Sequence, residues 1–333
     1  MRFQFSKTTG LSFGASLMAI AAVGIMPSTA SAQSNPDAEC VLTEDQANPT
    51  LAGANATGDD ALACGGDATA RGDGATAVGS GAVAIDTDTS AFGNQANATG
   101  LGATAYGASS NAVGENAHAI GYSSQATQRN ATAVGAFSSA TGVSSFSAGV
   151  SSQATGLGSV ALGNASAALA ENAHALGYAS QASGVDALAV GAFSRATAQS
   201  TSAVGGQAVA NQAGASAFGW QAMATAERAQ AFGHLATAQG VRSLAVGENA
   251  DAQTDNSTAI GNEAIANGID ALALGDTALA QGNSTTAVGG ESVATTPGST
   301  ALGWQARATG AMATAVGHQT TASGAQSFAG AED

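Results

Sequence analysis

The sequence predicts an all-β fold, a parallel β-roll solenoid of about 19 coils that follow a 14-residue period. A glycine stands at every fourteenth position from Gly65 to Gly317, 19 times without exception. An alanine follows each of these glycines by five positions and precedes 18 of them by two. Glycine makes up 45 of the 333 residues and aromatic residues only 5%, so a strict repeat has to build its interior from small side chains.

The spacing within one repeat gives two short strands and two turns. Side chains alternate between the faces of a strand, so "TAVG" (132–135) predicts a first strand with its alanine inward and its large residue outward. A second strand follows with small residues inward, and glycines such as Gly142 and Gly184 support the second turn. Coils stacked about 4.8 Å apart predict parallel pairing and a rod of roughly 90 Å.

A large apolar residue precedes the repeated glycine in 17 of the 19 coils, with Cys64 and Ala148 as the departures. We expect Phe146, on the same strand face, to fill the gap at Ala148. A continuous outward apolar stripe is not stable in water, so a second copy of the chain is the simplest cover. The predicted interface residues, called the apolar ladder below, are Val78, Phe92, Tyr106, Ile120, Val134, Leu162, Leu176, Val190, Val204, Phe218, Phe232, Val246, Ile260, Leu274, Val288, Leu302 and Val316.

The segment 1–32 has the pattern of a secretory signal peptide, cleaved after Ala32. A basic start precedes a largely apolar stretch at 11–26, which is short for the alternative, a transmembrane helix. No other segment is apolar enough to span a membrane as a helix. The expected organisation is a signal peptide (1–32), an N-terminal segment (33–61), the repeats (62–326) and a tail (327–333). Gly330 comes one position too early after Gly317 for the 14-residue period, which predicts a slip of register there.

The mature chain is strongly acidic, with six arginines against 23 acidic residues and a net charge of −17. Such a surface repels nucleic acid and anionic membranes, and it also keeps a long exposed surface soluble. Cys40 and Cys64 are the only cysteines. An even count in an exported protein favours one disulfide, with two free thiols as the alternative.

Two long stretches recur at whole multiples of the repeat. Residues 115–142 return at 171–198, four coils later, and residues 217–234 return at 301–318, six coils later. A solenoid grows by whole coils, so such duplications leave every contact between coils in register.

The segments "TAVGAFSSATG" (132–142) and "TAYGASSNAVG" (104–114) resemble the head repeats of YadA-like trimeric autotransporter adhesins. The resemblance covers about residues 62–326. It implies a left-handed β-roll, a homotrimer around one axis, and adhesion to host matrix proteins or cells from the bacterial surface. Family members usually continue into a coiled-coil stalk and an outer-membrane barrel, for which this sequence has no pattern. An anchored, a secreted and a periplasmic head therefore all stay open.

No catalytic, cofactor or metal motif is found: GxSxG, HExxH, the phosphate-binding glycine loop and the EF-hand loop are all absent. The nonapeptide calcium repeat does not fit a period of 14. We therefore expect a non-enzymatic protein without cofactors. His118 and His174 share one strand position four coils apart, so one chain cannot bring both to one metal. We interpret them as packed or hydrogen-bonded histidines; the alternative is that three copies of His118 meet around a three-fold axis.

Two kinds of ligand contact are possible at the turns. Trp220 and Trp304 share the position directly after the repeated glycine, where exposed aromatic residues serve as binding anchors; packing over the neighbouring coil is the alternative. Arg71, Gly72 and Asp73 form an RGD tripeptide of the kind that engages integrins, or a turn that happens to have this sequence. His234 and His318 follow at the same corner position and are expected to be exposed.

Three functions compete at this stage. The first is an adhesin head, and the second is a structural coat or biofilm protein that self-associates without a specific receptor. The third is an ice-binding solenoid, which would need a regular threonine array. The outward position six residues after the glycine, from Arg71 to Asn211, is too irregular for that.

Overall fold

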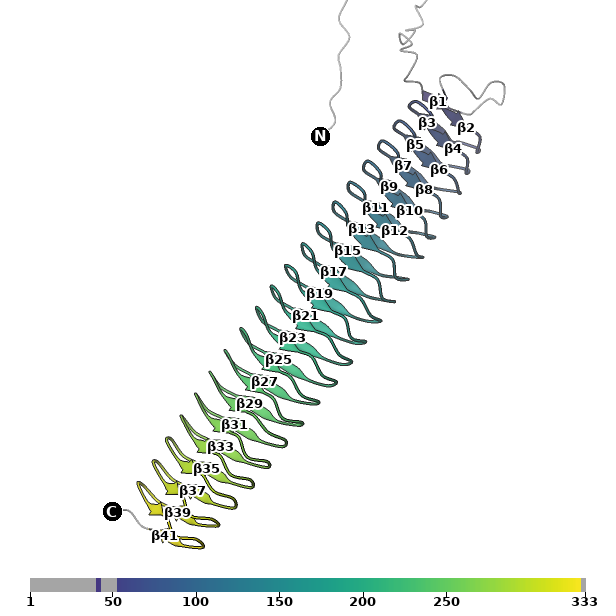
Figure 1. Cartoon of the computed structure of the whole chain (residues 1–333). Helices are drawn as coiled ribbons and strands as arrows, with labels where there is room; N and C mark the ends of the chain where they lie inside the picture. The colour runs from purple at the N-terminus through teal and green to yellow at the C-terminus, as the bar shows by residue number, and fades with distance from the viewer. Residues whose placement is uncertain (1–39, 43–52, 331–333) are drawn as a thin grey trace, which may run out of the picture. The chain divides into compact units, whose positions relative to one another are not determined.

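The computed structural model describes residues 40–42 and 53–330, which contain strands and turns but no helix. All of them lie in the compact unit Pro36–Asp333. The predicted parallel β-solenoid is confirmed, with about 20 turns. Each turn, called a coil here, has one three-residue strand and one two-residue strand, and Figure 1 shows the coils stacked one on the next.

The three-residue strands carry odd numbers and form the odd sheet. They are β1 (Cys40–Leu42), β3 (Leu62–Cys64), β5 (Thr76–Val78), β7 (Ser90–Phe92), β9 (Thr104–Tyr106), β11 (His118–Ile120), β13 (Thr132–Val134), β15 (Phe146–Ala148), β17 (Val160–Leu162), β19 (His174–Leu176), β21 (Leu188–Val190), β23 (Ser202–Val204), β25 (Ser216–Phe218), β27 (Gln230–Phe232), β29 (Leu244–Val246), β31 (Thr258–Ile260), β33 (Leu272–Leu274), β35 (Thr286–Val288), β37 (Thr300–Leu302), β39 (Thr314–Val316) and β41 (Phe328–Gly330).

The two-residue strands carry even numbers and form the even sheet. They are β2 (Asn55–Ala56), β4 (Thr69–Ala70), β6 (Val83–Ala84), β8 (Asn97–Ala98), β10 (Asn111–Ala112), β12 (Gln125–Ala126), β14 (Ser139–Ala140), β16 (Gln153–Ala154), β18 (Ala167–Ala168), β20 (Gln181–Ala182), β22 (Arg195–Ala196), β24 (Val209–Ala210), β26 (Met223–Ala224), β28 (Thr237–Ala238), β30 (Asp251–Ala252), β32 (Ile265–Ala266), β34 (Leu279–Ala280), β36 (Val293–Ala294), β38 (Arg307–Ala308) and β40 (Thr321–Ala322).

Pairing in both sheets follows the 14-residue period. In the odd sheet β21 pairs in parallel with β23, which places Val190 beside Val204. In the even sheet β20 pairs in parallel with β22, which places Gln181 beside Arg195. Equivalent residues of successive coils are therefore hydrogen-bonded neighbours, so any side chain that recurs with this period forms a continuous row.

The interior consists of small side chains. In the coil around Gly191 the inward residues Ala187, Ala189, Ser194 and Ala196 are fully buried. The Ser194 hydroxyl donates to the carbonyl of Gly191 at 2.9 Å. A serine is tolerated in this dry core because its hydroxyl finds a partner three residues back in its own coil.

One coil interrupts the alanine core. Ser147 replaces the usual alanine, and its hydroxyl lies 2.7 Å from that of Ser152 across the interior. The buried alanines accordingly fall into two clusters, one at 54–140 and the other at 154–322. The solenoid continues in register through this polar coil.

The two turns of a coil differ in their glycines. Corner A follows each three-residue strand and begins at the repeated glycine, as in 191–193; corner B follows each two-residue strand, as in 197–200. Gly191 has φ of 122°, and a Cβ there would lie 2.6 Å from the carbonyl oxygen of Gly205 in the next coil. Only glycine fits this position. Each corner then has a residue near φ of 55°, such as Phe193 or Ser200.

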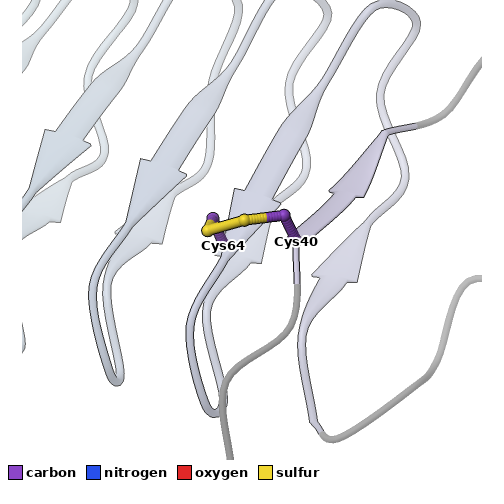
Figure 2. Close-up of a disulfide and its surroundings, with 2 residues drawn as sticks. All are labelled: Cys40 and Cys64. Atoms are coloured by element: carbon purple, nitrogen blue, oxygen red, sulfur yellow. A yellow bond between two sulfur atoms is a disulfide. The ribbon is translucent and has the colours of Figure 1, made fainter. Parts of the chain in front are cut away.

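The structure adds an antiparallel strand at the start of the described coils and corrects the sequence analysis at their end. At the start, β1 pairs antiparallel with β3, and the structure joins Cys40 to Cys64 by a disulfide (Figure 2). At the other end the predicted slip of register is wrong. β41 pairs in register with β39, so Gly330 lies beside Val316. Gly330 thus occupies the position of a ladder residue and not that of the repeated glycine.

Candidate adhesive surface

The apolar ladder lies on the outward face of the odd sheet. Each ladder residue is the third residue of its strand, next to a buried inward alanine, and is itself half-buried or exposed. Neighbouring rings touch along the row: Phe92 and Tyr106 have centroids 5.9 Å apart, and Phe218 stacks on Phe232 at 5.2 Å. These contacts leave the outer side of the row open in the single chain.

The gap in the ladder at Ala148 has a large neighbour on the same face. Phe146 is the first residue of β15 and Ala148 the third, with the buried Ser147 between them. Phe146 is exposed, and its aligned neighbours Thr132 and Val160 are smaller. In this coil the large apolar side chain therefore stands at the first strand position and not at the third.

The outward face of the even sheet is mixed and mostly polar. Its first strand positions include Gln125, Arg195, Met223, Asp251 and Arg307. Side chains here bond along the row, as where Asn97 donates through Nδ2 to Asn111 Oδ1 at 2.8 Å. Several polar groups of this face thus bond to neighbours along the row, whereas the third strand positions of the odd face carry apolar side chains.

Corner A carries four pairs of aromatic rings. Trp220 stacks on His234 at 5.0 Å between centroids, and Trp304 stacks on His318 at 4.7 Å. In another arrangement, Tyr122 meets Phe137 edge to face at 5.2 Å, and Tyr178 meets Phe193 likewise at 5.1 Å. All of these tyrosines, phenylalanines and tryptophans are exposed. Each tryptophan is packed on the next coil, as one alternative of the sequence analysis expected, and remains exposed. A role as binding anchors stays a prediction.

The sequence analysis did not predict the ring pairs, although the spacing of the tryptophans and histidines indicates the two stacks. Trp220 and His234 are one period apart, and so are Trp304 and His318. Positions one period apart are direct neighbours in this fold, so the spacing predicts a stack. The two edge-to-face pairs lie in the 56-residue duplication, as the two stacks lie in the 84-residue duplication.

The RGD tripeptide lies in corner B after β4. Arg71 and Asp73 are exposed, and Gly72 is half-buried. Main-chain bonds hold the tripeptide on both sides: Arg71 N donates to the Ala84 carbonyl at 2.8 Å, and Asp88 N donates to the Asp73 carbonyl at 2.9 Å. The Asp73 carboxylate accepts from Asp59 N at 3.1 Å. The tripeptide therefore lies within the stack of corners B, and its carboxylate is hydrogen-bonded to the preceding coil.

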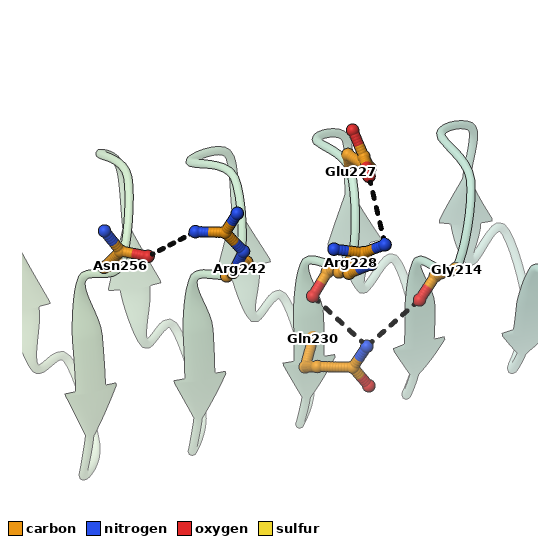
Figure 3. A network of polar contacts seen from close by, with 6 residues as sticks. All are labelled: Gly214, Glu227, Arg228, Gln230, Arg242 and Asn256. Carbon is orange, nitrogen blue, oxygen red and sulfur yellow. Dashed lines mark hydrogen bonds and ion pairs between the residues drawn. The ribbon is translucent and has the colours of Figure 1, made fainter.

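Charged side chains gather at corner B, and Figure 3 shows one such group. Arg228 lies 3.7 Å from Glu227 in its own corner, while Arg242 donates to Asn256 Oδ1 of the next coil at 3.4 Å. Gln230 at the start of β27 donates to the carbonyls of Gly214 and Arg228. These contacts are of small energetic weight. Two of them, Arg242 to Asn256 and Gln230 to Gly214, join adjacent coils.

The histidines on the odd sheet do not form a site within one chain. His118 is exposed in β11, and His174 is half-buried in β19, four coils away. Among the described residues no group of three His, Cys, Asp or Glu side chains is placed to hold a metal ion. The same part of the chain has no helix long and apolar enough to cross a membrane.

The comparison with known families decides the identity of the fold. The profile of the YadA head domain repeat matches nearly all of the described solenoid, at residues 56–82, 87–110, 112–138, 140–166, 168–194, 196–222, 224–250, 238–264, 252–278, 266–292, 280–306 and 308–329. The chain belongs to the YadA head family.

Two further comparisons complete this picture. No curated protein matches the chain. Among solved structures, the collagen-binding domain of the Yersinia adhesin YadA is similar at 16% identity and a TM-score of 0.20, over 54% of this chain and 68% of that one. The YadA heads are non-enzymatic binding domains, so this YadA head has an adhesin-type role.

Proposed function

We propose that this YadA head is a homotrimeric, exported adhesin that binds host matrix proteins or cells at the bacterial surface. The observation that carries the proposal is the apolar ladder. It runs along the outward face of the odd sheet from Val78 to Val316 with one gap at Ala148, while the outward face of the even sheet is mixed and mostly polar. Burying each such side chain stabilises an assembly by roughly 1.5–3 kcal/mol. Three copies that cover their ladders against one another are therefore much lower in free energy than three separate chains.

Sedimentation equilibrium on residues 33–333 tests the assembly. We expect a trimer at micromolar concentration, and a stable monomer at that concentration would contradict the proposal. A binding screen of the same protein against matrix proteins and cultured cells tests the adhesive role. Saturable binding to at least one of them is the expected result.

A structural coat or biofilm protein is the second candidate. The same ladder favours it, because self-association needs no receptor. The two functions differ in the binding screen: a coat protein assembles fully and binds no matrix protein or cell, whereas an adhesin does both.

A further inference from the structure

The two tryptophans of the chain stand in the same unusual setting at corner A. In each case the equivalent residue of the preceding coil is a glycine, Gly206 before Trp220 and Gly290 before Trp304. In each case the equivalent residue of the following coil is a histidine that stacks on the indole. Histidine therefore covers one indole face, while the other face is turned toward a coil that has no side chain at this position.

The Cδ1 edge of each indole lies close against the glycine of the preceding coil, and the glycine together with the exposed indole beside it is called a notch below. Neither Gly206 nor Gly290 has a left-handed φ, so the backbone does not require glycine there. A Cβ on Gly206 would lie 3.1 Å from Cδ1 of Trp220, and one on Gly290 would lie 3.3 Å from Cδ1 of Trp304. Larger residues occupy this corner position in other coils, as Tyr122 and Val150 do. The indoles remain 47% and 44% exposed.

Hydrogen-bonded side-chain pairs occupy the next position of the same two corners. The residue after each tryptophan donates to the residue after each glycine: Gln221 Nε2 to Gln207 Oε1 at 2.7 Å, and Gln305 Nε2 to Glu291 Oε2 at 2.7 Å. Each setting thus combines an exposed aromatic face with a planar amide or carboxylate pair at the same corner.

We propose that the Gly206–Trp220 and Gly290–Trp304 notches each bind one hexose ring of a neutral glycan. A pyranose ring has an apolar face of C–H groups that stacks on an indole, and hydroxyl groups at its edge that bond to amides and carboxylates. This matches both parts of the notch. The nearby carboxylates of Glu248, Asp276 and Glu291 and the net charge of −17 of residues 33–333 disfavour sialylated or sulfated sugars.

A proline-rich peptide is the other ligand whose rings stack on tryptophan. A prolyl ring has no hydroxyl group, so it would leave the Gln221–Gln207 and Gln305–Glu291 pairs unused. The two notches are six coils apart, roughly 29 Å at the usual strand spacing. One long glycan can therefore engage both, which raises its affinity through effective concentration.

This inference rests on the proposed adhesive function and names a ligand class for it. Because Trp220 and Trp304 are the only tryptophans, the intrinsic fluorescence of residues 33–333 reports on the notches alone. We would titrate the protein with cellotetraose and chitotetraose, using sialyllactose and a (Pro-Pro-Gly) repeat peptide as comparison ligands. A neutral tetrasaccharide is expected to change the emission saturably, and the comparison ligands are not.

Filling the notches gives the decisive variant. Gly206→Leu with Gly290→Leu keeps both tryptophans and should raise the Kd for the neutral tetrasaccharide by about tenfold or more. The matched control, Tyr122→Leu with Tyr178→Leu, changes exposed aromatic residues at the same corner position and should leave the Kd unchanged. If the filled variant does not fold by circular dichroism, Trp220→Leu with Trp304→Leu is measured by calorimetry with the same expectation.

Three results would overturn the notch proposal: no binding of a neutral sugar, binding that survives both the filled and the tryptophan variants, or preference for the peptide. The adhesion screen is scored separately. A wild-type head that adheres to cells but binds no sugar refutes the notch and leaves the adhesin function standing. A head that binds sugar through the notches but adheres to nothing refutes the adhesin function instead.

Discussion

The two halves of each coil share one interior and differ in their exteriors. In the coil around Gly191, the inward residues Ala187 and Ala189 of the first half are as fully buried as Ser194 and Ala196 of the second. Both halves also have a residue of positive φ, which recurs at every seventh position. The interior alone would thus accept a period of seven. The outward apolar residue and the corner glycine of the first half are what set the period to 14.

The two halves of each coil also differ in their corner glycines. At corner A every coil has glycine, because the backbone has φ between 120° and 142° and the next coil's carbonyl lies directly against the α-carbon. At corner B the corresponding position holds glycine in some coils, such as Gly184, and Ala170, Ala198 or Gln212 in others. The glycines of both corners lie close against the carbonyl of the next coil, but only those of the first corner also have a left-handed φ. This φ requires glycine at the first corner, whereas the second corner holds alanine or glutamine in some coils.

Deleting half a coil should have the largest effect. Removal of 197–203 exchanges the two halves for everything downstream, so Asn211 takes the position of Val204 and Phe218 takes the position of Asn211. Gln212 would enter the glycine position of Gly205, where φ is 135°. We expect the coils beyond the cut to slip or unfold, which thermal melting followed by circular dichroism measures as lost strand signal and a lowered Tm.

The matched control removes a whole coil, 197–210, and joins Ala196 to Asn211. Every later residue keeps its half of the coil, so we expect a folded, shorter solenoid that melts close to the parent. The comparison of halves would be wrong if the half-coil deletion melted like the parent while the whole-coil deletion collapsed.

A single methyl group at corner A should have the next largest effect. Gly191→Ala places Cβ 2.6 Å from the Gly205 carbonyl oxygen, at a φ that alanine rarely adopts. We expect a loss of about 2 kcal/mol or more in the free energy of unfolding. Gly184→Ala at corner B also brings Cβ into collision with the next coil, at the Ala198 carbonyl, but its φ is not left-handed. Ala170 and Ala198 show that coils with alanine at this position form, so we expect the corner to shift locally and the loss to be smaller than for Gly191→Ala. Equal losses in urea unfolding of the two variants would show that the corners do not differ.

Self-association can be used to compare outward residues of the odd sheet with those of the even sheet. Val190→Asp with Val204→Asp introduces two adjacent charges into the ladder, while Arg195→Ala changes the outward face of β22 between them in sequence. Since each valine contributes about 1.5 kcal/mol on burial, the double variant should weaken self-association by at least about tenfold in Kd. Arg195→Ala should leave it unchanged. Sedimentation at several concentrations would reveal the opposite ranking, which would place the interface on the even sheet.

The sequence predicted the parts of the fold that repeat and missed those that depend on one neighbour. The glycine period predicted the strands, their register and the inward alanines, because each is a property of every coil. The slip expected at Gly330 was wrong because a glycine was taken as a marker of the corner; strand pairing places Gly330 beside Val316. The stack of Trp220 on His234 needed the additional step that residues one period apart are in contact.

The smallest expected effect on the Tm of the whole solenoid is at the first coil, where only the odd sheet has an added strand. β1 pairs antiparallel with β3 and is linked to it through Cys40 and Cys64. Peptide mapping without reductant should find these two cysteines joined in the exported protein, and two free thiols would refute this. Closing a loop over a sequence separation of 24 is worth about 3 kcal/mol in the chain-entropy account.

That stabilisation should stay local, because each coil of a solenoid contacts only its neighbours. After reduction we expect faster amide hydrogen exchange in β3, which loses a strand at its edge, and little change in β4, which belongs to the even sheet. The Tm of the whole solenoid should move little. If the exchange rate rose equally in β3 and β4, the two sheets would open together at this end. The two halves of the coil would then differ in their exteriors but not in their local stability.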